Sequence, residues 1–294
     1  MSWENVLEYR RGCKESDEKR DAGLTQPEDI KNFRDIAYGP HKYNMLDVYV
    51  PKGTKKKLPA IISIHGGGWI YGDKELYQHY CMRLAQRGFA VVNFSYRLAP
   101  EDRYPAAVED CFAVFRWVRE NHEKYFIDYD NMFMVGDSAG GQLALQCLTI
   151  LTNSKYRALF DLEVPEDFTI RACGLNCGAY YLMVNRFMKP SDRTFMKDYL
   201  PEDYEKYIPQ LQASRYITSE FPPAFVMTAH NDFLKTMAKP LYWKLKLKNV
   251  ECEYHIYGSK DRKDIGHVFH VNCRLDEADR CNDDECAFFR RHMV

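Results

Sequence analysis

One short stretch, MFMVGDSAGGQLALQCLTILT at residues 132–152, constrains the fold more than any other part of the chain. It starts as an apolar run and continues with the apolar spacing of a helix. Ser138 stands between the two parts, with Gly136 and Gly140 two residues away on either side. A strand that turns at once into a helix needs glycines there, because side chains would collide where the two backbones approach. The stretch therefore predicts a buried strand, a tight turn that projects Ser138, and a helix.

The same alternation of strand and helix patterns extends over most of the chain. Apolar runs with the composition of strands buried on both faces occur at residues 58–64, 89–96, 131–135, 170–178, 222–230 and 250–258. Helical spacing occurs between them, at residues 74–88, 105–125, 141–152 and 237–249. This order predicts an α/β fold with a mostly parallel sheet, helices on both faces, and antiparallel strands at the start of the sheet.

Two segments fall outside this alternation. Residues 1–40 form a charged leader that we expect to be helical. Residues 178–220 are too long for an ordinary connection, and we interpret them as a small helical insertion over one edge of the sheet. The predicted division is thus a leader, 1–40, and a main domain, 41–294, that carries the insertion.

The composition argues against several classes of function. A formal net charge of −1 gives no electrostatic case for binding nucleic acid or an anionic membrane surface. The chain lacks an apolar run of about 18 residues, and its charged N-terminus lacks the apolar core of a secretion signal, so we expect a cytoplasmic protein. The ten cysteines include no paired Cys-x-x-Cys motif, and we expect neither a disulfide framework nor a metal site.

A second glycine-rich turn, HGGGW at residues 65–69, follows the apolar run that ends at Ile64. The carboxyl ends of parallel strands meet at one edge of a sheet, so this turn and Ser138 should lie close together. Consecutive glycines leave backbone N–H groups unshielded, as a site for an oxyanion requires. Taken alone, the glycines would also fit a simple flexible turn. Beside a serine, they favour acyl transfer, provided that a base activates the hydroxyl.

Three motifs together resemble the hormone-sensitive-lipase-like esterases of the α/β-hydrolase superfamily. They are HGGGW at 65–69, YRLAPEDRYPAAVED at 96–110 and GDSAGG at 136–141, and the resemblance covers roughly residues 40–275. It implies an α/β-hydrolase fold with a small helical cap, to which the leader and the insertion would contribute. It also implies a covalent acyl-enzyme mechanism that needs no cofactor.

The resemblance further implies roles for individual residues. Ser138 would be the nucleophile, and the backbone N–H groups of Gly67, Gly68 and Ala139 would form the oxyanion hole. His65 and the pair Tyr96-Arg97 would hold the surrounding loops in place and take no part in the chemistry.

The acid and the base are also assigned by the resemblance. The family pattern A-x-x-D-P-L-x-D aligns with AHNDFLK at 229–235, which makes Asp232 the acid, although Phe233 and Lys235 depart from the pattern. The family pattern H-x-F aligns with residues 267–269, which makes His267 the base. His267 would take the proton from Ser138, and Asp232 would fix the imidazole tautomer.

Other histidines and a charged loop remain as alternatives. His270 is a rival base three residues further on, whereas His230 and His255 fall in strand-like runs. The loop at 259–264 is more charged than the resemblance leads us to expect. It is either a solvated loop or a source of charged side chains, Lys260, Arg262 and Lys263, at the mouth of the site.

Three functions are compatible with these residues. The first is a carboxylesterase for short-chain, acetyl-like esters, with Trp69, Tyr180 and Tyr181 as substrate-binding residues. An acetylated sugar would suit the tyrosine-rich insertion, which also carries Met183, Phe187, Phe195, Met196 and Tyr199. The second is an amidase, a formamidase or a small peptidase with the same three residues. The third, a non-enzymatic receptor of the same fold, is disfavoured because all three candidate residues are present.

Aromatic content does not decide the acyl-chain length, and the oligomeric state cannot be read from the sequence.

Overall fold

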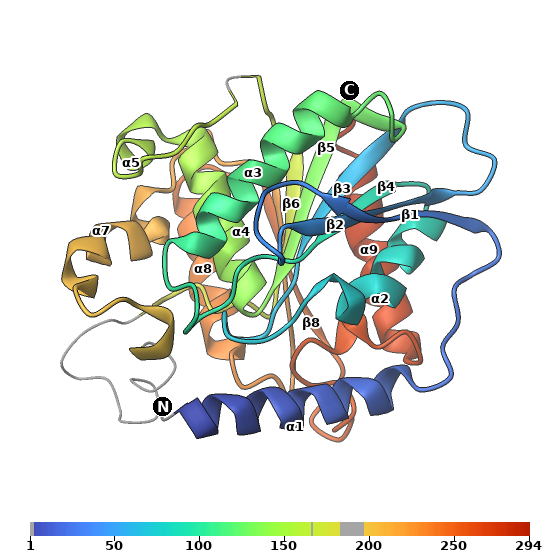
Figure 1. Cartoon of the computed structure of the whole chain (residues 1–294), viewed down its shortest axis with the longest axis horizontal. Helices are drawn as coiled ribbons and strands as arrows, with labels where there is room; N and C mark the ends of the chain where they lie inside the picture. Colours follow the sequence, from blue (N-terminus) through green and yellow to red (C-terminus); the bar gives the residue numbers. More distant parts are fainter. Residues whose placement is uncertain (1–2, 166, 183–196) are drawn as a thin grey trace.

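The central feature of the computed structural model, which describes residues 3–165, 167–182 and 197–294, is an eight-stranded sheet (Figure 1). Its strand order is β1-β2-β4-β3-β5-β6-β7-β8. Strand β2 runs antiparallel to β1 and β4, and every other neighbouring pair is parallel. The predicted mostly parallel sheet with antiparallel strands at its start is therefore confirmed.

The element bounds follow the patterns in the sequence. The strands are β1 (Ile30–Ala37), β2 (Met45–Pro51), β3 (Leu58–Ile64), β4 (Ala90–Phe94), β5 (Ile127–Asp137), β6 (Ala172–Asn176), β7 (Ala224–Ala229) and β8 (Cys252–Tyr257). The α-helices are α1 (Trp3–Asp21), α2 (Lys74–Gln86), α3 (Ala106–Asn121), α4 (Ala139–Thr152), α5 (Ser154–Arg157), α7 (Ile208–Leu211), α8 (Lys235–Leu247) and α9 (Asp276–Arg290). Three 3₁₀ turns are η1 (Tyr204–Tyr207), η2 (Ala213–Tyr216) and η3 (Phe269–Val271).

Helices cover both faces of the sheet (Figure 1). Helices α3, α4 and α8 pack on one face, where Ile62 and Ile64 of β3 join their core. Helices α2 and α9 pack on the other face, where Ile61 joins a second core. Because successive side chains of a strand point to opposite faces, a strand buried on both sides must be apolar throughout. This explains the continuous apolar runs of the sequence.

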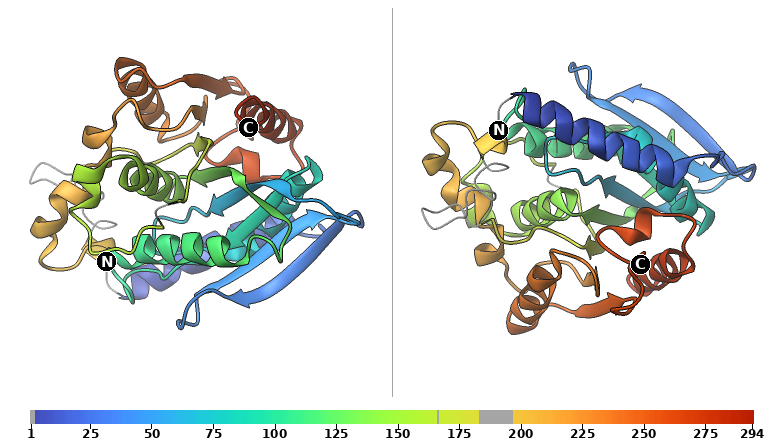
Figure 2. Two further views of the ribbon diagram at one scale, coloured as in Figure 1. Left: turned by 90° about the horizontal axis from the view of Figure 1, so that it is seen from above. Right: turned by 90° about the horizontal axis from the view of Figure 1, so that it is seen from below.

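The leader differs from its expected form. It is helical only over α1, and residues 30–37 form strand β1, which pairs with β2 at the edge of the sheet. The expectation of a helical leader is therefore wrong for this part. The reason is that the β1 backbone gains a neighbouring strand as a hydrogen-bond partner, which the sequence of the leader alone does not reveal. Helix α1 itself runs across one end of the molecule (Figure 2).

The segment predicted to be an insertion is helical in part. Within residues 197–220 it contains η1, α7 and η2. Met183, Phe187, Phe195 and Met196, which we expected in the cap, lie outside the described residues.

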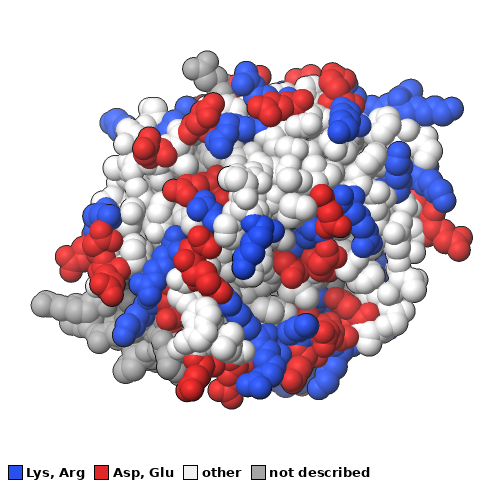
Figure 3. Space-filling model, in the orientation of Figure 1, with Lys and Arg blue, Asp and Glu red and all other residues white. Residues whose placement is uncertain are grey.

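The positive and negative side chains are nearly equal in number, 41 against 42. Figure 3 shows Lys and Arg interspersed with Asp and Glu across the face drawn there, in keeping with the formal net charge of −1. Among the described residues, none of the helices combines the length and the apolar character needed to cross a membrane.

Candidate active site

Ser138 occupies the sharp turn between β5 and α4. Its backbone has φ 52° and ψ −117°, a conformation that L-residues rarely adopt. The turn is possible because glycines flank it. A Cβ on Gly136 would lie 2.3 Å from the carbonyl oxygen of Gly140, and a Cβ on Gly140 would lie 2.1 Å from that of Ile64. The two glycines let strand, helix and neighbouring strand pack tightly while the serine side chain projects from the turn.

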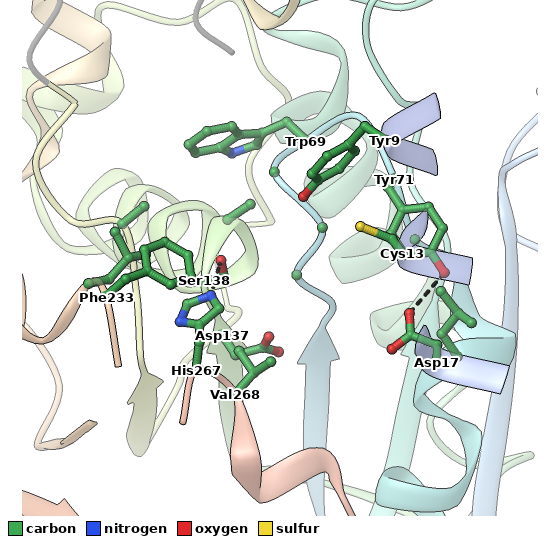
Figure 4. Close-up of a pocket in the computed structure, with 18 of the residues that line it drawn as sticks. Tyr9, Cys13, Asp17, Trp69, Tyr71, Asp137, Ser138, Phe233, His267 and Val268 are labelled. Carbon is green, nitrogen blue, oxygen red and sulfur yellow. Dashed lines mark hydrogen bonds between the residues drawn. The ribbon is translucent and has the colours of Figure 1, made fainter. Parts of the chain in front are cut away.

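Three side chains from different connections meet at this turn, and Figure 4 shows two of them, Ser138 and His267. The Nε2 atom of His267 lies 2.9 Å from the Oγ atom of Ser138. The Nδ1 atom of the same ring lies 2.7 Å from the Oδ1 atom of Asp232. Asp232 follows β7 and His267 follows β8, so both come from carboxyl ends of strands. The structure thus brings together the three side chains that the resemblance had singled out.

Asp232 is held as an ionised acceptor. Its carboxylate accepts hydrogen bonds from the Thr228 hydroxyl at 2.8 Å and from the Leu234 backbone N–H at 2.8 Å. The residue is only 3% exposed. Burial raises the pKa of this carboxyl, but the bonds from His267, Leu234 and Thr228 outweigh burial, so the pKa lies below its ordinary value. Asp232 can therefore orient and stabilise a protonated imidazole.

The HGGGW turn lines the same cavity as Ser138. Gly67 and Gly68 have φ values of 113° and 62°. A Cβ on Gly67 would lie 2.0 Å from the carbonyl oxygen of Tyr71, so only glycine fits there. Ala139 is the first residue of α4, and the N–H groups of a first helical turn have no partner within the helix. All three residues line the same cavity as Ser138.

A tyrosine connects this turn to the serine turn. The Tyr77 hydroxyl accepts from the Gly66 N–H at 2.9 Å and donates to the Asp137 carboxylate at 2.7 Å. Both Tyr77 and Asp137 are buried. Burial raises the pKa of the Asp137 carboxyl to about 7, against the opposing effect of the bond from Tyr77. Tyr77 thus fixes the turn of Gly66 to the residue before Ser138.

Replacing Tyr77 by phenylalanine should lower kcat about 10- to 100-fold on an ester substrate and leave KM nearly unchanged, because the amides of the turn lose their alignment. Tyr80→Phe is the matched control: its hydroxyl is buried on the same helix but forms no hydrogen bond to Gly66 or to Asp137. Steady-state rates of both variants test this. Equal losses in the two variants, or a change in KM alone, would contradict the role of Tyr77.

A cavity of about 780 Å³ opens over Ser138. Trp69 and Tyr181, two of the three residues predicted to bind substrate, line it. The third, Tyr180, does not: its side chain is 3% exposed and belongs to the core. The prediction for Tyr180 is therefore corrected. The chain turns after β6, so that Tyr180 points back against Gly178 while Tyr181 faces the cavity.

The alternatives raised by the sequence are placed elsewhere. His270 is buried and packs edge-on against Tyr80, and burial lowers its pKa to about 3. It therefore remains uncharged and does not line the cavity. In the charged loop, Arg262 pairs with Asp264 at 2.8 Å and with Asp276 at 3.4 Å. The described lining of the cavity contains no residue of this loop.

His65, Tyr96 and Arg97, which we expected to hold the loops around the site, form ring-stacking, hydrogen-bond and ion-pair contacts. The His65 ring stacks on Tyr96 with centroids 4.0 Å apart, and the Tyr96 hydroxyl donates to the His65 carbonyl at 3.0 Å. Arg97 binds Asp110 and Glu109 through its guanidinium group. Burial lowers the pKa of His65 to about 4, so its imidazole is neutral at physiological pH.

Two buried carboxyl groups should make stability depend on pH. Burial raises the pKa of Glu285 on α9 to about 7, and the charge of Asp137 adds to this effect. In the unfolded chain a glutamate has a pKa of about 4.3. Between these values the folded state binds more protons, so the free energy of unfolding falls as pH rises.

Glu285→Gln should remove the part of this dependence that Glu285 contributes, whereas Asp137 should retain its own part. From pH 5 to pH 8 the wild type should lose on the order of 2 kcal/mol of stability relative to the variant. Urea unfolding of both proteins at the two pH values measures the difference. If the free energy of unfolding changed with pH by the same amount in both proteins, the raised pKa of Glu285 would be contradicted. Groups other than Glu285 are present in both proteins.

Thr228 and Tyr77 are contacts of the site that the sequence did not single out. Thr228 lies four residues before Asp232 at the end of β7, and this spacing could have suggested it. Tyr77 carries no local signal, because a helix that is distant in sequence brings it to the site.

Comparison with known proteins gives consistent matches. A model of a family described as having the alpha/beta hydrolase fold matches residues 61–271. A protein of Acanthamoeba polyphaga mimivirus, named for an alpha/beta hydrolase, is 26% identical over 191 residues, which are 63% of this chain and 55% of the relative. The match thus spans little more than half of that relative's length. An acetyl esterase of Salmonella schwarzengrund is 25% identical over 260 residues, 84% of this chain and 76% of the relative.

A solved structure resembles the whole chain. Esterase B from Lactobacillus rhamnosis, inhibited by a tributyrin phosphonate, has a TM-score of 0.88 and 25% sequence identity. The comparison covers 99% of this chain and 96% of that one.

Proposed function

This chain belongs to the hormone-sensitive-lipase-like family of the α/β-hydrolase superfamily, and from that premise we propose that it is a serine carboxylesterase acting on short-chain acyl esters. Its relatives and structural neighbours include esterases. The observation that carries the proposal is the hydrogen-bonded triad of Ser138, His267 and Asp232. The distance from Ser138 Oγ to His267 Nε2 is 2.9 Å, and the distance from His267 Nδ1 to Asp232 Oδ1 is 2.7 Å.

In the proposed reaction the Ser138 Oγ atom attacks the ester carbonyl carbon. The Nε2 atom of His267 accepts the hydroxyl proton and then donates it to the leaving alcohol, which yields an acyl-enzyme. A water molecule next loses a proton to the same nitrogen and attacks the acyl group. The nitrogen then returns this proton to the Ser138 oxygen as the acid leaves, so that Ser138 and His267 are both restored. Throughout, Asp232 keeps the Nδ1 proton in place and stabilises the imidazolium.

The negative charge on the carbonyl oxygen needs donors in both tetrahedral intermediates. We assign this role to the N–H groups of Gly67, Gly68 and Ala139. The Gly66 N–H already donates to the Tyr77 hydroxyl and is therefore occupied. This leaves the N–H groups of the next two glycines of the turn, Gly67 and Gly68, as the candidate donors. Each such donor contributes about 2.7–4 kcal/mol to lowering the barrier.

We propose that α1 and the segment at 178–220 act as the cap of the site. Five residues of α1 line the cavity, namely Tyr9, Cys13, Ser16, Asp17 and Arg20, and Figure 4 shows Tyr9, Cys13 and Asp17 across from Ser138. Tyr181 lines the cavity from the other segment. The cavity volume of about 780 Å³ falls in the ordinary range for small-molecule sites. An acetylated sugar is a further candidate substrate, since Ser16, Asp17 and Tyr71 place polar groups among the apolar residues that line the cavity.

Activity on p-nitrophenyl esters should be highest for acetate or butyrate and should fall toward decanoate, because the cap bounds the cavity. The kcat/KM values of the series from acetate to decanoate measure this. A steady rise to decanoate would contradict the preference for short chains without contradicting ester hydrolysis.

The same three residues would also serve an amidase, a formamidase or a small peptidase. A panel of matched substrates, p-nitrophenyl acetate against p-nitroacetanilide and N-formyl compounds, separates these functions. The proposal expects the ester to be cleaved faster than the amides by several powers of ten. Comparable rates on an amide would favour the second function.

A further inference from the structure

The thiol of Cys177 lies close to two residues of the proposed triad, Asp232 and His267. Cys177 follows β6, is 1% exposed and has φ 47°, and its backbone N–H donates to the Met227 carbonyl at 2.9 Å. Its Sγ atom, a carboxylate oxygen of Asp232 and an imidazole nitrogen of His267 all lie within 4.8 Å of one another. Cys177 has no part in the proposed hydrolysis, so the presence of its thiol at this point requires another account.

Together these three groups form a donor set suited to a thiophilic divalent cation. Thiolate, carboxylate and imidazole are the ligands that Zn²⁺ takes in proteins, at distances of about 2.0–2.3 Å. In a tetrahedral site with these bond lengths, the ligand atoms would lie about 3.4–3.6 Å apart. Small side-chain movements therefore suffice to close the present arrangement around an ion.

The charge balance also favours such an ion. A divalent cation with one thiolate, one carboxylate and one neutral imidazole makes a complex of zero net charge. This matters because Cys177 and Asp232 are both buried, and a net charge there would be costly. Only His267 of the three lines the cavity, and its side chain is 19% exposed, so it provides the route by which an ion would enter.

We propose that Cys177, Asp232 and His267 form a latent site for a thiophilic divalent cation, Zn²⁺ or Cd²⁺, whose occupancy switches the hydrolytic centre off. Binding of the cation does not depend on the proposed function, whereas inhibition of ester hydrolysis by the bound cation rests on it. Nδ1 is the nitrogen that faces Asp232, and it becomes the ligand.

With Nδ1 on the metal, the remaining proton of the neutral ring sits on Nε2. That nitrogen then cannot accept the proton of Ser138, so the serine is not activated. The thiol gives up its proton to solvent on binding, and one proton is released for each ion bound. The inhibition is reversible, because a chelator that removes the ion lets Cys177 and His267 regain their original protons.

The test compares Cys177→Ala with Cys13→Ser. Cys13 is the matched control because its thiol lines the same cavity. Within the described part of the chain, however, it belongs to no group of three metal ligands. Rates on p-nitrophenyl acetate, each relative to the metal-free rate of the same protein, are measured against Cd²⁺ concentration and again after EDTA.

The expected result is reversible inhibition of the wild type and of Cys13→Ser, with at least about a tenfold higher inhibitory concentration for Cys177→Ala, because a ligand is lost. Equal sensitivity of Cys177→Ala and the wild type would overturn the proposal. If Cys177→Ala does not fold, Cys177→Ser takes its place, since a hydroxyl is a poor ligand for Cd²⁺.

Direct binding is read separately in protein carrying Ser138→Ala. Cd²⁺ should produce the ultraviolet charge-transfer absorption of a cadmium–thiolate bond, and this band should vanish when Cys177→Ala is added. Absence of the band in the Ser138→Ala protein would overturn the metal site, even if the wild-type protein proved to be an active esterase. Its presence in a protein without esterase activity would support the site and refute only the proposed function.

Discussion

Replacing Ser138 by alanine is expected to lower kcat on p-nitrophenyl acetate by about 10⁶-fold, to the background rate. Without the Oγ atom no acyl-enzyme can form, and His267 has no hydroxyl to deprotonate. The fold should persist, because alanine and serine have the same Cβ and tolerate the φ of 52° equally. Initial rates, together with a thermal melt to verify folding, measure the effect.

Ser16→Ala is the matched control for this variant. Ser16 also lines the cavity, but it comes from α1 and forms no part of the triad. Its replacement should change kcat by less than about tenfold, within the range of a lost substrate contact. Similar residual rates for the two variants would mean that Ser138 is not the nucleophile.

Replacing Asp232 by asparagine should lower kcat by about 10⁴-fold. Thr228 bonds to Oδ2 and Leu234 to Oδ1, so in asparagine the one carbonyl oxygen can accept from Leu234 while the amide N–H donates to the Thr228 hydroxyl, and the local fold should be retained. The negative charge beside Nδ1 is lost, however, and the amide can hold the ring in the wrong tautomer. The loss should appear in kcat more than in KM, because the interaction is stronger in the transition state.

Asp264→Asn serves as the control for the acid. Asp264 lies in the charged loop before His267 and pairs with Arg262 at the surface. Its replacement should leave kcat within about threefold of the wild type, as expected for an exposed ion pair. A larger loss from Asp264→Asn than from Asp232→Asn would reassign the acid.

The serine turn could be predicted from the residues alone. Glycines on both sides of Ser138 have one simple physical meaning, which is close approach of backbones, and the structure places carbonyl oxygens at 2.1 Å and 2.3 Å from their missing side chains. The buried strands could be predicted equally well, because burial on both faces favours a nearly continuous apolar run, as in β3, where Ser63 interrupts the apolar residues.

The partners of Ser138 could not be derived in this way. Asp232 and His267 are far from Ser138 in the sequence, and nothing in their local surroundings distinguishes them from other acids and histidines. Only the resemblance to a family singled them out. The contacts that support them, such as Tyr77 on Asp137, depend on how a helix packs on the sheet, and this packing leaves no periodic pattern in the sequence.

The errors have physical causes of the same kind. Tyr180 and Tyr181 are adjacent and chemically identical, and only the path of the chain after β6 decides which of them faces the cavity. Strand β1 was expected to be helical because a charged leader offers no apolar alternation. Its hydrogen bonds to β2 form only in the complete sheet.

The most direct test of the account is the site of reaction with a fluorophosphonate, which labels only a serine made nucleophilic by a neighbouring base. Peptide mass spectrometry of the labelled protein should find a single adduct, on Ser138, and no adduct in Ser138→Ala. A folded protein that stays unlabelled, or one that carries the adduct on another residue, would contradict the claim that this turn holds an activated nucleophile.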